Sequence, residues 1–261
     1  MTPNRAVLLE ALGIDRSAGG VVALVGGGGK TSLMWALAGE LRARSLTVVT
    51  TTTTKIFPPQ PGESPCLLIV SRDSELNELP HLLAFHGHVT VTGPALSAGK
   101  LGGITNETVE LCATLAQWVI VEADGAAGKP IKAPEDWEPV IPRSARLVVP
   151  VVGLDCLGMP VSEVTVFRVE RFLEVTGSRR GDPITPRVVA GLLHSAAGAL
   201  KGIPRASTVV PFLNKFDLLP DTAPVREIAR NLSALGTARI GRIVAGTLKP
   251  DVCAIVFPVA H

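Results

Sequence analysis

The sequence predicts an α/β fold of three layers with a mostly parallel central sheet. Short apolar runs rich in β-branched residues alternate with segments of helical periodicity, which is the pattern of strands joined by crossover helices. The length of 261 residues and the hydrophobic fraction of 46% suit one large domain with a substantial core. We therefore expect a single domain over residues 1–261, within which residues 154–200 could form an inserted sub-domain.

The expected elements follow from these patterns. Strands are predicted at the apolar runs 21–25, 46–50, 66–70, 88–92, 118–122, 146–152, 207–213 and 240–244. Helices are predicted at 31–43, 74–85, 105–115, 185–193 and 224–235. In the first helix Leu33, Leu37 and Leu41 share one face, which should pack on the sheet. The proline-rich segment 129–142 is expected to be an irregular, exposed loop.

Composition and charge give no sign of a nucleic-acid or membrane partner. The formal net charge is +2 and charged residues make up 18% of the chain, so we expect no nucleic-acid partner. No apolar run is long enough to span a membrane, and the first fifteen residues lack the pattern of a signal peptide. We expect a cytoplasmic protein without a membrane partner. Buried thiols in a reducing compartment are expected from four widely spaced cysteines, Cys66, Cys112, Cys156 and Cys253.

A glycine-rich turn lies between the first predicted strand and the first predicted helix. A phosphate group needs converging backbone N–H groups, a helix N-terminus and a lysine, and this stretch offers all three. Lys30 is placed to reach the outer phosphates, and the Thr31 or Ser32 hydroxyl could bind Mg²⁺. The residues predicted to surround the phosphates are therefore Gly26, Gly27, Gly28, Gly29, Lys30, Thr31 and Ser32.

The match to the P-loop pattern GxxxxGK[ST] is incomplete. Leu24 stands where the leading glycine usually lies, so a flexible strand-to-helix corner with an incidental lysine is the alternative. The buried-type strand before the glycines and the amphipathic helix after Lys30 favour phosphate binding. We therefore predict a P-loop NTPase-like domain that binds a nucleotide, with Lys30 as a catalytic residue.

The stretch VVPFLNKFDLLP carries an NKxD pattern at the end of an apolar run. The Asp217 carboxylate could accept both adjacent N–H donors of guanine, whereas adenine presents an acceptor there. Lys215 could lie across the base, and Asn214 could pin the loop to the phosphate side. An ordinary polar turn is the alternative. We predict GTP as the nucleotide, with ATP as the other candidate.

Two carboxylates lie at the end of the strand predicted at 118–122. Glu122 and Asp124 are two positions apart and share a face at the strand end, where carboxylates next to a P-loop commonly hold Mg²⁺. The alternative is that Asp124 only caps the turn before Gly125. No DxxG pattern follows, because Ala127 occupies the glycine position. The predicted Mg²⁺ ligands are Thr31, Glu122 and Asp124, and Asp124 is the second predicted catalytic residue.

Threonines end the strand predicted at 46–50. Thr50, Thr52 and Thr54 share one face, and hydroxyls at this end of a parallel strand lie where open α/β sheets bind ligands. Five consecutive threonines can equally reflect β-propensity alone. His86 and His88 form an isolated HxH pair, which is more typical of a turn than of a metal site.

Six stretches, taken in order, resemble the YqeC family, accessory proteins for selenium-dependent molybdenum hydroxylases. They are VGGGGKTSLMWALAGEL, TVVTTTTTKIFPP, GPALSAGKLGG, VIVEADGAAGKPIKAPEDWEPVIP, VVGLDCLGMP and FLNKFD. The stretch VFRVE departs from the family, in which a histidine and a proline are expected around Arg168 and Glu170. The resemblance implies a maturation or cofactor-delivery factor whose partner is a molybdenum hydroxylase or its cofactor machinery.

The predicted function is Mg²⁺-dependent binding and slow hydrolysis of a nucleoside triphosphate in that accessory role. Hydrolysis would switch the loops 50–55 and 123–134 and so release a client or cofactor. The sequence assigns no arginine or glutamine as the hydrolysis aid. Two alternatives stay open, namely a kinase or nucleotidyltransferase acting on a small cofactor, and a nucleotide-binding module without catalysis.

Overall fold

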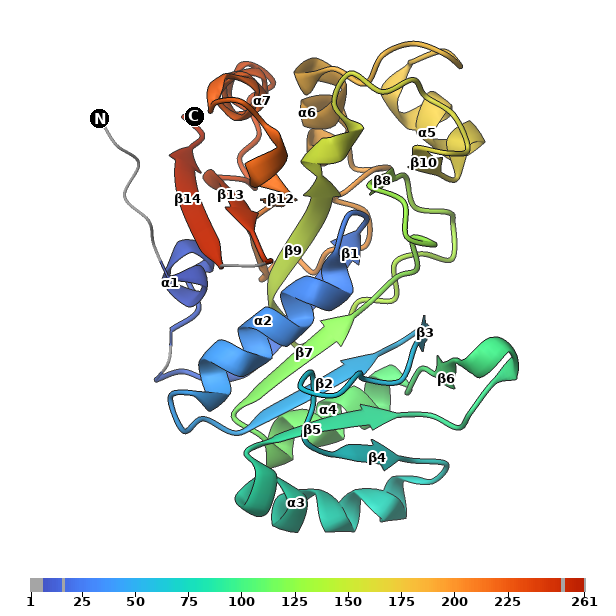
Figure 1. The fold of residues 1–261 in the computed structure, drawn as a ribbon, viewed down its shortest axis with the longest axis vertical. Helices are drawn as coiled ribbons and strands as arrows, with labels where there is room; N and C mark the ends of the chain where they lie inside the picture. The colour runs from blue at the N-terminus through green and yellow to red at the C-terminus, as the bar shows by residue number, and fades with distance from the viewer. Residues whose placement is uncertain (1–6, 16, 250–251, 261) are drawn as a thin grey trace.

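The central sheet of the protein is wide and mostly parallel. A computed structural model describes residues 7–15, 17–249 and 252–260 (Figure 1). Over these described residues, every neighbouring pair of strands in the central sheet is parallel except the pair β13 and β14. The strands in order are β14 (Cys253–Pro258), β13 (Arg242–Thr247), β12 (Phe212–Asn214), β9 (Ala145–Gly153), β1 (Gly20–Gly26), β7 (Trp118–Glu122), β2 (Val48–Thr52), β5 (His88–Thr92) and β4 (Leu67–Ile69), and β11 (Thr208–Val209) also pairs with β9.

Helices cover both faces of this sheet. On one face α2 (Lys30–Arg42) lies across β1 and β7, and α1 (Leu8–Leu12) packs beside it (Figure 1). The core on the other face is formed with α3 (Leu79–His86), α4 (Asn106–Leu115), α5 (Val169–Thr176), α6 (Pro186–His194) and α7 (Ala223–Ala234). The three-layer α/β architecture is therefore confirmed.

The alternation of β1 explains the two cores. Val22 and Leu24 pack with Leu33 and Leu37 of α2, whereas Val25 and its alternate neighbours belong to the core on the opposite face. Consecutive strand side chains point to opposite faces, so an apolar run without polar interruption is buried on both sides. The predicted contact between the leucine face of α2 and the sheet is confirmed.

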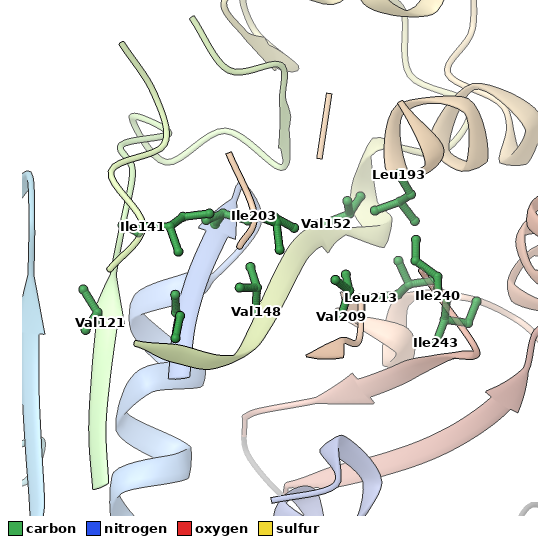
Figure 2. Packing of buried hydrophobic residues seen from close by; sticks show 14 of the residues in the cluster. Val121, Ile141, Val148, Val152, Leu193, Ile203, Val209, Leu213, Ile240 and Ile243 are labelled. Carbon is green, nitrogen blue, oxygen red and sulfur yellow. The ribbon is translucent and has the colours of Figure 1, made fainter. Parts of the chain in front are cut away.

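Figure 2 shows part of the second core. Val148 and Val152 of β9 lie with Leu213 of β12 and Leu193 of α6, all of them buried. Burying one such side chain contributes about 1.5–3 kcal/mol. This packing fixes β12 beside β9, which pairs with β1, and the ends of those strands carry the candidate site.

Several predicted elements are found with shifted or divided bounds. β5 and β7 begin and end at the predicted residues, whereas β2 starts two residues late. The strand predicted at 207–213 is split into β11 and β12, because Pro211 has no N–H to donate. The helix predicted at 74–85 is a 3₁₀ segment, Asp73–Glu78, followed by α3, which has a proline in its first turn.

Four short strands form two small sheets outside the central one. β3 (Lys55–Ile56) pairs antiparallel with β6 (Leu101–Gly102), and β8 (Ile131–Lys132) pairs parallel with β10 (Val166–Phe167). These strands were not predicted, nor were α1, α5 and β14. β8 lies in the segment expected to be an exposed loop, and that expectation was wrong for Ile131 and Lys132, which are buried.

Residues 154–200 continue from the end of β9 through β10, α5 and α6. Their buried side chains, among them Leu154, Phe172 and Leu193, belong to the same core cluster as the sheet. A separate sub-domain stays a prediction. Within the described ranges, no helix is both long enough and apolar enough to cross a membrane.

Candidate functional site

The candidate site lies at the carboxyl edge of four neighbouring parallel strands. β7, β1, β9 and β12 are adjacent in that order, and they end at Glu122, Gly26, Gly153 and Asn214. Residues far apart in the sequence therefore meet around the glycine turn. Ligands of open α/β sheets bind at this edge.

Lys30 is the first residue of α2, and its side chain turns back into the protein. Its Nζ donates to the Gly26 carbonyl oxygen at 2.6 Å and pairs with Asp124 at 3.1 Å and Glu122 at 3.6 Å. Burial acts to lower the pKa of Lys30, but the two carboxylates outweigh it and raise that pKa. Lys30 is thus a charged ammonium held between Glu122 and Asp124.

Three of the predicted oxygen ligands lie together. The Thr31 hydroxyl donates to Glu122 Oε2 at 2.8 Å, and the Lys30 ammonium pairs with both Glu122 and Asp124. Burial raises the pKa of Glu122, although the charge of Lys30 acts in the opposite direction. The structure therefore brings Thr31, Glu122 and Asp124 to one place.

These oxygens suit a Mg²⁺ ion that is bound together with a phosphate, rather than a metal ion held by protein ligands alone. In the described part of the chain, no three His, Cys, Asp or Glu residues form a metal-binding cluster. Mg²⁺ prefers oxygen ligands and is typically held by one or two carboxylates together with phosphate and water. Thr31, Glu122 and Asp124 fit that donor set, and they would hold Mg²⁺ jointly with a bound phosphate.

The backbone donors of the glycine turn divide into two groups. The N–H of Gly26 donates to Asp124, that of Gly27 to the Val151 carbonyl at 2.9 Å, and that of Gly28 to the Lys129 carbonyl at 2.9 Å. The N–H groups of residues 29–32 form the first turn of α2, where no intrahelical acceptor exists. None of the described residues accepts from these four groups. The donors available to an anion are therefore those of residues 29–32.

Close packing accounts for the glycine at position 28. Gly28 has φ +81°, and a Cβ there would lie 2.0 Å from the Gly153 nitrogen. A side chain is therefore excluded by both the backbone conformation and the neighbouring strand end. Glycine at this position serves the packing of a strand-to-helix corner, which was the alternative left open by the sequence.

Asn214 contacts the glycine turn directly. Its side chain is buried, and its Nδ2 donates to the Gly28 carbonyl at 2.8 Å. Lys215 and Asp217 do not contact the turn, since Lys215 Nζ pairs with Asp155 at 2.5 Å and exposed Asp217 accepts from the Thr247 hydroxyl at 3.0 Å. The NKxD stretch thus has one residue on the glycine turn, whereas Lys215 and Asp217 pair with other residues.

The other hydroxyl residues predicted near the site differ in their contacts. The Ser32 hydroxyl makes no hydrogen bond within the described residues, whereas Thr31 contacts Glu122. Thr52 donates to the Glu122 carbonyl at 2.8 Å, which ties the end of β2 to β7. Thr50 bonds buried His88 at 2.9 Å and Thr90 at 2.8 Å, and this strand packing accounts for its hydroxyl.

His88 is part of that strand packing rather than of the candidate site. Burial lowers its pKa to about 4, so the imidazole is neutral near pH 7. In the described residues it belongs to no metal-binding cluster. The expectation that the HxH pair is not a metal site stays a prediction.

Lys132 and Glu138 join the cluster around Asp124, a contact that was not predicted for either residue. Lys132 Nζ lies 3.2 Å from Asp124 Oδ2, 2.6 Å from Glu138 Oε2 and 2.7 Å from the Gly125 carbonyl. Both flanking residues of Lys132, Ile131 and Ala133, are apolar and buried. Apolar residues on both sides of Lys132 indicate in the sequence that this lysine is buried. The nearby prolines led instead to the prediction of an exposed loop.

Comparison with known proteins identifies the family. Residues 22–170 match the sequence model of the family described as YqeC protein. The chain is also 32% identical over 222 residues to a protein of Escherichia coli (strain K12) named "Uncharacterized protein YqeC", an alignment that covers 81% of this chain and 82% of the relative. The chain belongs to the YqeC family. The YqeC match includes the glycine turn, Glu122, Asp124 and Lys132, and it ends before Asn214.

Proposed function

We propose that this YqeC protein binds a Mg²⁺–nucleoside triphosphate and hydrolyses it slowly. The observation that carries the proposal is the convergence of the Lys30 ammonium, the Thr31 hydroxyl and two carboxylates at the amino end of α2. The four unpaired N–H groups of that helix end and its dipole favour a phosphate group. The donors and the charge that a phosphate and its cation require are therefore next to one another.

Binding requires Lys30 to exchange partners. Its ammonium now bonds the Gly26 carbonyl and Asp124, and a phosphate at the helix end would draw it away from both. Mg²⁺, when bound, neutralises phosphate charge, and Thr31, Glu122 and Asp124 would hold it. Lys30 and Asp124 are the proposed catalytic residues, because both would touch the reacting phosphate or its cation.

GTP is the proposed nucleotide, and ATP is the alternative. Asp217 is exposed, and its carboxylate can accept the two N–H donors of guanine. Asn214 supports the same assignment, because it links the strand end before Asp217 to the glycine turn through Gly28.

The biological role rests on the family resemblance. We propose that nucleotide turnover serves the maturation of a selenium-dependent molybdenum hydroxylase, the client associated with the YqeC family. Asp124 lies directly before the segment 125–134, which packs on the glycine turn through Lys129 and Pro130. A change at the phosphate would thereby reach the exposed residues Ala127 and Gly128 of this segment, which a client could contact.

A nucleotide-binding module without turnover is the second candidate. It is favoured by the glycine turn itself, because the N–H groups of Gly26, Gly27 and Gly28 are engaged by Asp124, Val151 and Lys129. Fewer free donors would stabilise a developing transition-state charge less. Phosphate release measured over hours, with and without the hydroxylase, separates this candidate from a slow hydrolase.

Isothermal titration of GTP and of ATP, each with and without Mg²⁺, tests the proposal. We expect binding that Mg²⁺ strengthens and a preference for GTP. Equal affinities for the two nucleotides would refute the guanine assignment. If neither nucleotide bound, the proposed function would be wrong.

A further inference from the structure

Lys132 is a second buried cation on Asp124, and the nucleotide scheme above leaves it without a role. It lies on β8, outside the central sheet, and its side chain is 1% exposed. A charge in such a place is costly unless it is paired. Its partners are two carboxylates and one carbonyl oxygen, so its position is fixed from three directions.

The two oxygens of Asp124 have different partners. Oδ1 lies 3.1 Å from the Lys30 ammonium, whereas Oδ2 lies 3.2 Å from the Lys132 ammonium. The N–H of Gly26 is closer to Oδ2, at 2.9 Å, than to Oδ1, at 3.2 Å. Oδ2 is therefore the anchored oxygen, and Oδ1 is the one that faces the phosphate-binding lysine.

Glu138 holds Lys132 in this position. Its Oε2 lies 2.6 Å from Lys132 Nζ, and its Oε1 lies 3.7 Å from Arg168 Nη2. The Arg168 guanidinium in turn stacks over the Phe167 ring at 4.7 Å. β8 pairs with β10, which ends at Phe167. The positions of Lys132 and Arg168 are therefore fixed by backbone pairing in addition to their side-chain contacts.

We propose that Lys132 is the positioning residue that orients Asp124 for Mg²⁺, an inference that rests on the proposed function. When Lys30 moves to a phosphate, Asp124 loses one of its two cations. Lys132 keeps Oδ2 paired, so Asp124 stays in place and presents Oδ1 to the metal. Partners that orient a metal ligand in this way typically change metal affinity about 10- to 100-fold when they are removed.

The test measures how strongly Mg²⁺ enhances GTP binding in Lys132→Gln, Lys132→Arg and the native chain, by isothermal titration. We expect Lys132→Gln to weaken the Mg²⁺ affinity of the GTP-bound protein about 10- to 100-fold. GTP affinity without Mg²⁺ should stay close to native. Lys132→Arg should restore most of the Mg²⁺ dependence, because it returns the positive charge to Asp124.

Two further variants separate positioning from folding. Lys201 donates to the Glu135 carbonyl, in the segment that also carries Lys132, and it does not pair with Asp124. Lys201→Gln should therefore leave the Mg²⁺ dependence native. Glu138→Gln keeps a hydrogen-bond acceptor for Lys132 but removes the negative charge of the Glu138 carboxylate. It should therefore weaken the Mg²⁺ affinity, as Lys132→Gln does, but by a smaller factor.

The outcomes are distinct. Native Mg²⁺ dependence in Lys132→Gln would overturn the inference and leave the proposed function intact. Equal losses with and without Mg²⁺, or no rescue by Lys132→Arg, would show that Lys132 only supports the fold, which also overturns it. Failure of the native chain to bind GTP would refute the proposed function, and this inference with it.

Discussion

Replacing Lys30 by methionine removes the cation that two buried carboxylates share. Breaking a buried ion pair from one side costs about 3–5 kcal/mol, because the remaining charge is left unpaired. Asp124 retains the Lys132 ammonium and the Gly26 N–H, whereas among the described residues the Glu122 side chain retains only the Thr31 hydroxyl. We therefore expect Lys30→Met to lower the free energy of unfolding by about 3 kcal/mol at about pH 8, the lower end of that range.

The loss should depend on pH through Glu122. Its pKa is raised above 4.5 in the folded protein, so the folded state binds a proton more readily than the unfolded state. The stability that this proton contributes is present at low pH and is lost as the pH rises through the folded pKa. Removing Lys30 raises that pKa further, so Lys30→Met should cost less at about pH 5 than at about pH 8.

Urea denaturation followed by far-UV circular dichroism at both pH values measures the two costs, provided the slopes of the unfolding curves match the native ones. Lys55→Met is the matched control, since Lys55 is exposed on β3, and it should change stability by less than about 0.5 kcal/mol. A loss below about 1 kcal/mol would refute the buried ion-pair network, because typical exposed pairs contribute that little. A loss that is equal at both pH values would refute the role assigned to Glu122.

Two further variants test the Asn214–Asp217 stretch. Asn214→Ala leaves the Gly28 carbonyl without its donor, so we expect a loss of about 1–3 kcal/mol in the free energy of unfolding. In the same variant GTP should bind at least about tenfold more weakly, which corresponds to about 1.4 kcal/mol, and native affinity would contradict the contact's role. Asp217→Asn, at an exposed position, should change stability by less than about 0.5 kcal/mol and shift preference from guanosine to xanthosine nucleotides, as competition binding can measure. An unchanged preference would show that the base lies elsewhere.

Local sequence patterns predicted the elements that position the site. β5 and β7 were predicted with their bounds because each is a continuous buried run between turn residues. β14 was not predicted, since it is an antiparallel edge strand whose place is set by pairing with β13 rather than by crossover periodicity. α1 and α5 are short, and packing rather than intrinsic propensity stabilises such helices.

The site was only partly predictable for a related reason. Glu122 ends a recognisable strand and Asp124 lies two residues further on, so their approach to Lys30 could be expected from a parallel sheet. The acceptors of the Gly27 and Gly28 N–H groups belong to segments more than a hundred residues away in the sequence. No local sequence pattern predicts such contacts. The burial of Lys132 likewise depends on its distant partner β10.

The most direct test of the proposed site is a crystal structure with Mg²⁺ and a non-hydrolysable GTP analogue. We expect phosphate oxygens at the N–H groups of residues 29–32, Mg²⁺ beside Thr31 and Asp124, and Lys30 Nζ moved from the Gly26 carbonyl to the phosphate. A nucleotide bound at another edge of the sheet, with Lys30 still on Gly26 and Asp124, would contradict the assignment.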